Sequence, residues 1–385
     1  NIMDLTERSI QLHKKLKGKI EVRSKYDIKT KDDLALIYTP GVAASCLRIK
    51  DNPEESYLLT SRNNTVAVIS DGTAVLGLGD IGPLAAMPVM EGKSALFKKF
   101  GNVDAIPIVL DTKDTEEIIK TIVYLAPSFG GINLEDISAP RCFEIERRLR
   151  EMLDIPVFHD DQHGTAIACG AALINALKFV EKDLCNVRIV INGAGSAGIA
   201  ISTFLIELGA RDLVVCDIAG IMNVEDNGLN SHQKVLAGKT NPHGIKGTLK
   251  DALKEADVFI GVSVGNIVNK EMVSSMNKDA IIFALANPTP EINREDAIDA
   301  GARIYGAGIS NIQNQINNAL VFPGLFNGAL EARVKQITVE MEIAACKALS
   351  AVIPENLLHE DYIIPDIFNE QVSTSICEAI KKLSR

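Results

Sequence analysis

One stretch of the chain, residues 186–217, predicts a complete βαβ unit. It begins with a β-branched run, residues 187–191, which is suited to a strand buried on both faces of a sheet. A glycine-rich turn follows, and from Ile199 apolar residues recur at helical spacing. Residues 213–216 form a second short apolar run, and Asp217 lies at its carboxyl end. The stretch therefore predicts an α/β fold with a doubly wound parallel sheet.

The turn inside this unit has the pattern G-x-G-x-x-G, which is typical of dinucleotide-binding loops. The first glycine permits the tight turn, the second lets the backbone approach a pyrophosphate, and the third lets the helix pack closely on the strand. The helix N-terminus then directs its free N–H groups at the phosphates. An acid after the second strand would accept hydrogen bonds from the adenine ribose. We predict that the dinucleotide is bound by Gly193, Ala194, Gly195, Ser196, Ala197, Gly198 and Asp217.

The acid at position 217 also predicts which dinucleotide is bound. A carboxylate favours a free 2′-hydroxyl and repels a 2′-phosphate. The residues that follow, Ile218-Ala-Gly-Ile, offer no Arg or Lys to reverse that preference. We therefore predict NAD, with NADP as the alternative.

A second glycine pattern, residues 77–82, is a weaker match. It also follows a strand-like run, but Pro83 and Pro88 interrupt the residues after it, and the next strand-like run is too far along for one crossover. We interpret it as a tight glycine-rich turn in another domain.

Composition excludes several classes of protein. The 385 residues are enough for two domains, and 46% hydrophobic with 23% charged residues is typical of a globular protein. A net charge of −10 argues against nucleic acid or an anionic membrane as partner. No run approaches the roughly 18 apolar residues that a membrane-spanning helix needs. The seven cysteines show no C-x-x-C spacing, and the first residues are not those of a signal peptide, so a reducing, cytoplasmic location is expected.

Three acids follow short strand-like runs in the first half of the chain. Glu135 and Asp136 come after one such run, and Asp161 follows another within a His-Asp-Asp-Gln-His loop. Neighbouring residues of a strand point to opposite faces, so Glu135 and Asp136 can converge only where the strand ends. Oxygen ligands alone fit a hard ion, so the sequence predicts a Mg²⁺ or Mn²⁺ site.

Other interpretations of these residues stay open. His159 and His163 suggest zinc, although neither their number nor their spacing matches a zinc helix. Acids at strand ends also act as helix caps or solvated charges. Lys93, in the early turns of a predicted helix, becomes a usable base if burial and a nearby cation lower its pKa. Tyr38 lies near a turn, because Pro40 and Gly41 end any regular element there.

Several long motifs, in order, resemble those of the malic enzymes, and closest is the short bacterial-type branch. The resemblance covers nearly the whole chain and is carried by Tyr38-Thr-Pro-Gly-Val, residues 70–82, Glu91-Gly-Lys93, residues 131–136, residues 158–166, residues 192–198, Ala286-Asn287-Pro and Asn314-Gln-Ile-Asn-Asn318.

This resemblance implies oxidative decarboxylation of malate to pyruvate and CO₂, with reduction of NAD(P). It implies Lys93 as general base, Tyr38 as general acid and Asp160 as the group that orients Lys93. It implies Glu135, Asp136 and Asp161 as metal ligands. Asn287 and Asn318 would hold the substrate and the nicotinamide end of the cofactor.

The family's fold implies a catalytic domain over residues 1–160 and a dinucleotide domain over residues 161–385. The helical tail, from about Leu330, is expected to pack back onto the first domain. Family members are commonly oligomers, so a homodimer is expected, and the segment that carries Tyr38 is a candidate to serve a neighbouring subunit.

The chain departs from the family at two places that bear on carboxylate binding. Larger malic enzymes have an Arg where this chain has Ala74, and residues 308–313 lack an Arg and an Asp that are usual in the short branch. Three alternatives therefore remain: malolactic conversion of malate to lactate, a metal-free amino-acid dehydrogenase, and a catalytically weak NAD-binding module.

Overall fold

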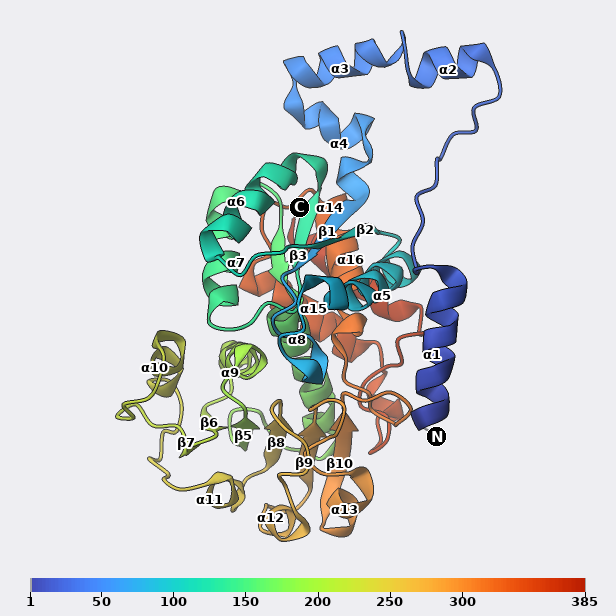
Figure 1. Cartoon of the computed structure of the whole chain (residues 1–385). Coiled ribbons are helices and arrows are strands. Elements are labelled where there is room, and N and C mark those ends of the chain that lie inside the picture. The colour runs from blue at the N-terminus through green and yellow to red at the C-terminus, as the bar shows by residue number, and fades with distance from the viewer. Residues whose placement is uncertain (1, 385) are drawn as a thin grey trace.

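The computed structural model describes residues 2–384, with side chains from Asp4 to Ser384, and it contains two sheets joined by one long helix (Figure 1). The first sheet is wholly parallel, with the strand order β2-β1-β3-β4. Its strands are β1 (Thr65–Ser70), β2 (Asp104–Val109), β3 (Gly131–Leu134) and β4 (Val157–His159), and its connecting helices are α5 (Pro83–Gly101), α6 (Thr115–Leu125), η4 (Ala126–Ser128) and α7 (Arg141–Met152).

Alternating side chains of β1 enter two different hydrophobic cores. Val66 and Val68 join a core with Phe97 of α5, whereas Ala67 and Ile69 join a core with residues of α6 and α7. This alternation is the period of two that a strand imposes. The first sheet is therefore covered by helices on both faces, and its functional residues are confined to its edges and ends.

The second sheet has the order β10-β9-β8-β5-β6-β7 and is parallel except for β7, which runs antiparallel to β6. It confirms the predicted doubly wound α/β fold; β7 is a two-residue strand, too short for any sequence periodicity to predict it. The strands are β5 (Arg188–Asn192), β6 (Asp212–Asp217), β7 (Gly220–Ile221), β8 (Val258–Gly261), β9 (Ala280–Ala284) and β10 (Ala302–Ala307). The helices around them are α9 (Ser196–Leu208), α10 (Ser231–Ala237), α11 (Leu249–Leu253), α12 (Lys270–Ser274) and α13 (Arg294–Asp299).

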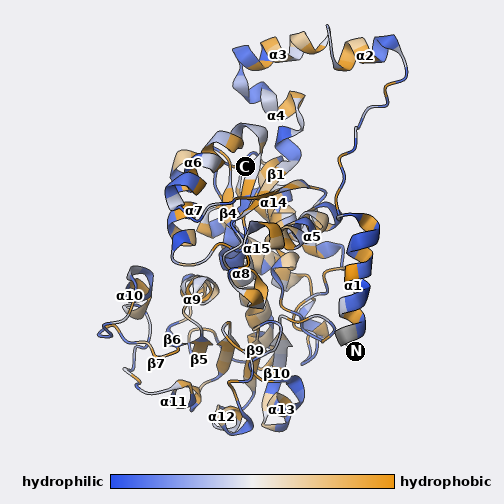
Figure 2. Cartoon of the chain, viewed as in Figure 1, coloured by the Kyte–Doolittle hydropathy of each residue, from blue (hydrophilic) through white to orange (hydrophobic). Residues whose placement is uncertain are grey.

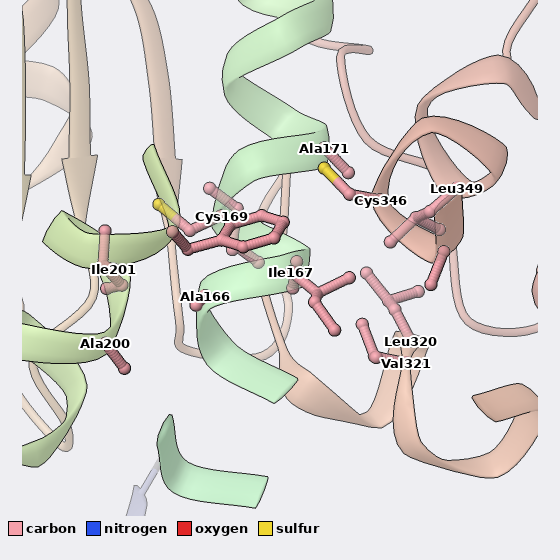
Figure 3. Packing of buried hydrophobic residues seen from close by; sticks show 14 of the residues in the cluster. Ala166, Ile167, Cys169, Ala171, Ala200, Ile201, Leu320, Val321, Cys346 and Leu349 are labelled. Carbon is pink, nitrogen blue, oxygen red and sulfur yellow. The ribbon is translucent and has the colours of Figure 1, made fainter. Parts of the chain in front are cut away.

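Helix α8 (Asp160–Phe179) connects the two sheets. The sequence pattern from Ala166 to Val180 indicates a helix, but the helix of the structure already begins at Asp160, because Asp160 and Asp161 in its first turn place negative charge at the positive end of the helix dipole. Figure 3 shows its buried face between α9 on one side and the C-terminal helices on the other. A Cβ at Gly170 would lie 2.8 Å from Phe204 and 3.1 Å from the sulfur of Cys346, so this glycine permits the close approach of the three helices.

The C-terminal segment packs back onto the first sheet's helices, as predicted. Its elements are η5 (Asn318–Leu320), α14 (Phe322–Glu331), α15 (Val339–Ala351), η6 (Glu355–Leu357) and α16 (Gln371–Leu383). The ring of Phe97 in α5 contacts the rings of Phe322 and Phe326 in α14, with centroids 4.6 and 5.4 Å apart. The end of the chain thus holds α5, and with it Lys93, in place.

Residues 2–64, which we call the N-terminal arm, lie largely outside these cores (Figure 1). The arm contains α1 (Ile2–Leu16), α2 (Lys31–Ile37), α3 (Val42–Asp51), η1 (Pro53–Glu55), α4 (Ser56–Leu59) and η2 (Ser61–Asn64). Among its described side chains only Tyr57 is buried. Figure 2 shows apolar residues along α2 and α3, and Leu36, Leu47 and Leu58 are 68%, 58% and 80% exposed. Within the described residues, no helix is both long and apolar enough to cross a membrane.

Candidate active site

The three predicted metal ligands converge at the carboxyl edge of the first sheet. Strand β3 ends at Leu134, and Asp136 then adopts a left-handed backbone conformation with φ of 54°. This turn brings the Asp136 side chain to the same side as Glu135. The two carboxylates can converge because the strand has already ended. Asp161 comes from the first turn of α8, and one carboxylate oxygen from each of the three acids lies within 4.8 Å of the others.

Lys93 lies beside this cluster. Its Nζ is 2.7 Å from Asp160 Oδ2 and 3.2 Å from Glu135 Oε1, and its side chain is 8% exposed. The ammonium also lies 4.3 Å from the centre of the Phe322 ring, a cation–π contact that the sequence did not reveal. A Cβ at Gly164 would lie 2.0 Å from Asp160 Oδ1 and 3.2 Å from Asn318 Cβ, so Asp160 and Asn318 meet over this glycine.

Charge in this cluster is unbalanced, because three buried acids (Glu135, Asp136 and Asp160) and the half-buried Asp161 face one lysine. Burial, and then the neighbouring Asp161 and Glu135, raise the pKa of Asp136. Burial likewise raises the pKa values of Glu135 and Asp161. Asp136 Oδ2 is buried without a hydrogen-bond partner among the described residues. These oxygens fit a hard divalent cation, which would neutralise the crowded carboxylates.

Lys93 is expected to become a usable base where burial and a bound cation lower its pKa, and the protein's own residues act in the opposite direction. Burial alone would lower this pKa, but the negative charges of Asp160 and Glu135 outweigh burial and raise it. Lys93 is therefore held as an ammonium by the same carboxylates that crowd one another.

The two histidines of the zinc interpretation have other surroundings. His163 pairs with two acids from other helices: its Nε2 lies 2.6 Å from Glu146 Oε1 of α7, and its Nδ1 lies 3.4 Å from Glu342 Oε1 of α15. His159 Nε2 is 3.9 Å from Asp161 Oδ2. Within the described residues, the group that could hold a metal contains three carboxylates and no histidine. The Glu146–His163–Glu342 cluster was missed, since a single Glu on a charged helix gives no signal in the sequence.

The glycine loop of the second sheet has the geometry of a phosphate-binding turn. It joins β5 to α9, and Gly193 has φ of +119°, a conformation that favours glycine. A Cβ at Gly198 would lie only 1.7 Å from the carbonyl oxygen of Gly193. The first N–H groups of α9 therefore open onto the loop. The sheet's order also reverses between β5 and β8, and such a switch point is where open α/β sheets bind ligands.

The other predicted cofactor and substrate residues border the same edge. Asp217 ends β6, and its Oδ1 accepts a hydrogen bond of 2.7 Å from the backbone N–H of Ala219. Asn287 follows β9, and a Cβ at Gly308 would lie 3.1 Å from its Nδ2. A Cβ at Gly77 would lie 2.7 Å from the Asn287 carbonyl oxygen. The second glycine pattern therefore does form a turn in the first sheet's half of the chain, and it reaches across to the Asn287 loop.

Tyr38 is the predicted catalytic residue that the structure does not bring to Lys93. It follows α2 in the N-terminal arm and is 63% exposed. Figure 1 shows α2 and α3 well away from α5 and α8.

The arrangement defines a class of protein: a dinucleotide-dependent oxidoreductase with an acid cluster and a buried lysine opposite its nucleotide loop. Residues 17–150 match the family model for the malic enzyme N-terminal domain, and residues 162–384 match the model for the malic enzyme NAD-binding domain. The chain belongs to the malic enzyme family, as its motifs predicted, and it is an oxidoreductase with an NAD-binding domain.

Individual relatives agree with this assignment. The chain is 53% identical over 379 residues to an NAD-dependent malic enzyme of Geobacillus stearothermophilus, with 98% of this chain and 79% of the relative covered. It is 51% identical to a bifunctional malic/malolactic enzyme of Bacillus subtilis, with 99% of this chain and 93% of the relative covered. The crystal structure of an NAD-dependent malic enzyme from Thermotoga maritima superimposes with a TM-score of 0.94 at 47% identity, with 97% and 98% covered.

Proposed function

We propose that this malic enzyme converts malate and NAD⁺ to pyruvate, CO₂ and NADH. The observation that supports this most strongly is that a buried lysine and three converging carboxylates meet at the N-terminal end of α8, where Asn318 lies against Gly164. Residues 1–160 supply Lys93, Glu135 and Asp136, whereas residues 161–385 supply Asp161 and the nucleotide loop.

In this proposal Glu135, Asp136 and Asp161 hold Mg²⁺ or Mn²⁺. When bound, the cation polarises the oxygen on C2 of malate and offsets the negative charge that raises the pKa of Lys93. The crowding of these three acids, together with the unpartnered Asp136 oxygen, supports their assignment as ligands.

The chain's own residues carry the protons. Lys93, oriented by Asp160, accepts the proton of the malate hydroxyl as the C2 hydrogen leaves as hydride for C4 of the nicotinamide. The bond between C3 and the C4 carboxylate then breaks, CO₂ leaves, and Tyr38 gives a proton to C3. Asn287 and Asn318 position the substrate and the nicotinamide. One proton is taken and one is returned, so the reaction balances as malate plus NAD⁺ to pyruvate, CO₂ and NADH.

NAD is proposed as the preferred cofactor because the Asp217 carboxylate would repel a 2′-phosphate. The relatives include both NAD-dependent and NADP-dependent malic enzymes, so the family alone does not decide this choice. The test is malate-dependent absorbance at 340 nm with Mn²⁺ and each nucleotide. A higher kcat/KM with NAD supports the proposal, and a strong preference for NADP contradicts it.

Malolactic conversion is the second candidate, because the Bacillus subtilis relative is named as bifunctional. It uses the same site but retains NADH and releases lactate. Product analysis after malate turnover separates the two: pyruvate with equimolar NADH supports the first proposal, and lactate without net NADH supports the second.

We also propose a homodimer in which Tyr38 serves the site of the second subunit. The N-terminal arm exposes apolar side chains that a second copy would cover, and Tyr38 lies far from Lys93 of its own chain (Figures 1 and 2). The test mixes a Tyr38→Phe subunit with a Lys93→Ala subunit after separate purification. A shared site predicts that the mixed dimers regain one working site, or about a quarter of wild-type activity in an equal mixture. No recovery after confirmed subunit exchange contradicts it.

A further inference from the structure

Glu291 is a fully buried acid that the mechanism above does not use. It lies between β9 and α13, and its side chain is 0% exposed. No ion-pair partner faces it among the described side chains, although burial without a counter-charge is unfavourable for a carboxylate. Burial raises its pKa to about 7, against the opposing effect of nearby backbone N–H groups, of which that of Ala286 donates a hydrogen bond to the carboxylate. Because Glu291 is buried without a cationic partner among the described residues, a functional reason for its position is expected.

The carboxylate lies where two loops of the nucleotide-binding edge meet. Its Oε1 accepts a hydrogen bond of 2.9 Å from the backbone N–H of Ala286, the residue directly before Asn287. A Cβ at Gly261 would lie 1.9 Å from Oε2, so the carboxylate fills the space above the end of β8. Ser263, whose N–H also faces this carboxylate, accepts a hydrogen bond of 2.8 Å from Asn192 of β5.

Further backbone contacts join the same two loops. The N–H of Asn266 donates to the carbonyl of Pro290 at 3.0 Å, and the N–H of Val268 donates to the carbonyl of Glu291 at 3.1 Å. A Cβ at Gly265 would lie 2.5 Å from the Thr289 carbonyl oxygen. The loop of residues 261–268 and the loop of residues 286–291 are therefore packed together as one unit. The Glu291 side chain is buried between them.

We propose that Glu291 is a positioning residue, which fixes Asn287 and Ser263 for the nicotinamide half of the dinucleotide. This inference rests on the proposed role of Asn287 in holding the nicotinamide end. Oε1 accepts the N–H of Ala286, whereas Oε2 is buried with no hydrogen-bond partner among the described residues, so no acceptor faces either oxygen. A glutamine would place its NH₂ either against the N–H of Ala286 or in the buried space at Oε2, where it would find no acceptor, and either arrangement disfavours the contact between the two loops.

The test compares two ligands that share an adenosine half. Glu291→Gln in the full chain is titrated with NADH by fluorescence and with ADP-ribose by calorimetry, beside wild type and Glu295→Gln. Glu295 is an exposed acid on α13 and gives a matched control. We expect Glu291→Gln to weaken NADH binding by about tenfold or more, because the buried NH₂ would lack an acceptor and would disturb the two loops, and to leave ADP-ribose binding within about twofold. The control should change neither.

The possible outcomes separate clearly. Unchanged NADH binding overturns the inference, and equal loss of both ligands overturns it as well, since the residue is then a brace for the whole domain. Gly261→Ala, whose methyl would displace the carboxylate from the other side, should likewise weaken NADH binding and leave ADP-ribose binding nearly unchanged. The inference also fails if neither variant folds. If wild type binds NADH and the variants show this difference between the two ligands, but wild type does not oxidise malate, the proposed function fails while the positioning role stands.

Discussion

The carboxyl edges of the two sheets differ in the chemical groups that line them. The edge of the first sheet is made of charged side chains: four acids and Lys93, nearly all buried, with the acids raising one another's pKa values. The edge of the second sheet is made mainly of backbone, with a glycine turn, a helix N-terminus and two linked loops. The first edge is therefore sensitive to the loss of a charge, and the second to the addition of a carbon atom.

The largest expected effect is at the charged edge. Lys93→Ala should lower kcat for malate oxidation by about a thousandfold or more, because a positioned base contributes about 10²–10⁴ and the variant also leaves Asp160 and Glu135 without their cation. The measurement is NADH formation with Mn²⁺. Lys99→Ala, an exposed lysine on the same helix, is the control. Near-normal oxidation by Lys93→Ala would remove it as the base.

A single methyl group should disable the backbone edge. In Gly198→Ala the new Cβ would lie 1.7 Å from the Gly193 carbonyl, so the loop must move and NADH binding should weaken by about a hundredfold. Manganese binding should be unchanged, since the acids belong to the other sheet. Gly228→Ala, where a Cβ meets nothing within 4 Å, is the matched control. Equal loss of Mn²⁺ and NADH would contradict the separation of the two edges.

Removing one charge from the acid cluster should have opposite effects on metal binding and stability. Burial and neighbouring acids raise the pKa of Asp136 in the folded state, so its ionisation favours unfolding and stability is lost as pH rises above the ordinary value of about 4. Asp136→Asn should therefore raise the Tm of the metal-free protein at pH 8 while weakening Mn²⁺ by about tenfold or more. Calorimetry with and without Mn²⁺ measures both.

The control for this variant is Asp111→Asn, an exposed acid that follows β2 of the same sheet. It should change neither quantity. A lower Tm for metal-free Asp136→Asn would show that the acid cluster stabilises the fold, and that repulsion between its carboxylates does not destabilise it.

The smallest effect concerns His163. Burial lowers its pKa, but Glu146 and Glu342 outweigh burial and raise it to about 9. A folded-state pKa above the unfolded value of about 6.5 gives stability that is complete below pH 6.5 and is lost as pH rises through about 9. The Tm of wild type should therefore fall more between pH 6.5 and 9 than that of His163→Asn. Parallel curves would show that His163 carries no charge in the fold.

The sequence predicted those features that depend on local pattern. The β-branched and apolar runs located β5 and β6 of the second sheet, and the glycine spacing located the turn before α9. Features that depend on residues far apart in the chain were not predicted. Phe322 contacts Lys93, Glu342 contacts His163, and Glu291 joins two loops only because the fold brings them together.

Sequence-local patterns also failed where charges from distant parts of the chain decide a pKa or where a helix begins. Burial and a nearby cation were expected to lower the pKa of Lys93, but three acids from distant positions raise it in the absence of the cation. Residues 166–180 gave a clear helical pattern, but the charged turn before them resembled a loop, and the helix includes it.

The central claim is that the side chains of Glu135, Asp136 and Asp161 hold one divalent cation beside Lys93. Anomalous diffraction from crystals grown with Mn²⁺, NAD and a malate analogue tests it directly. We expect one strong manganese peak in contact with those three carboxylates. A peak elsewhere, with the three acids left unligated at a manganese concentration that supports turnover, would contradict it.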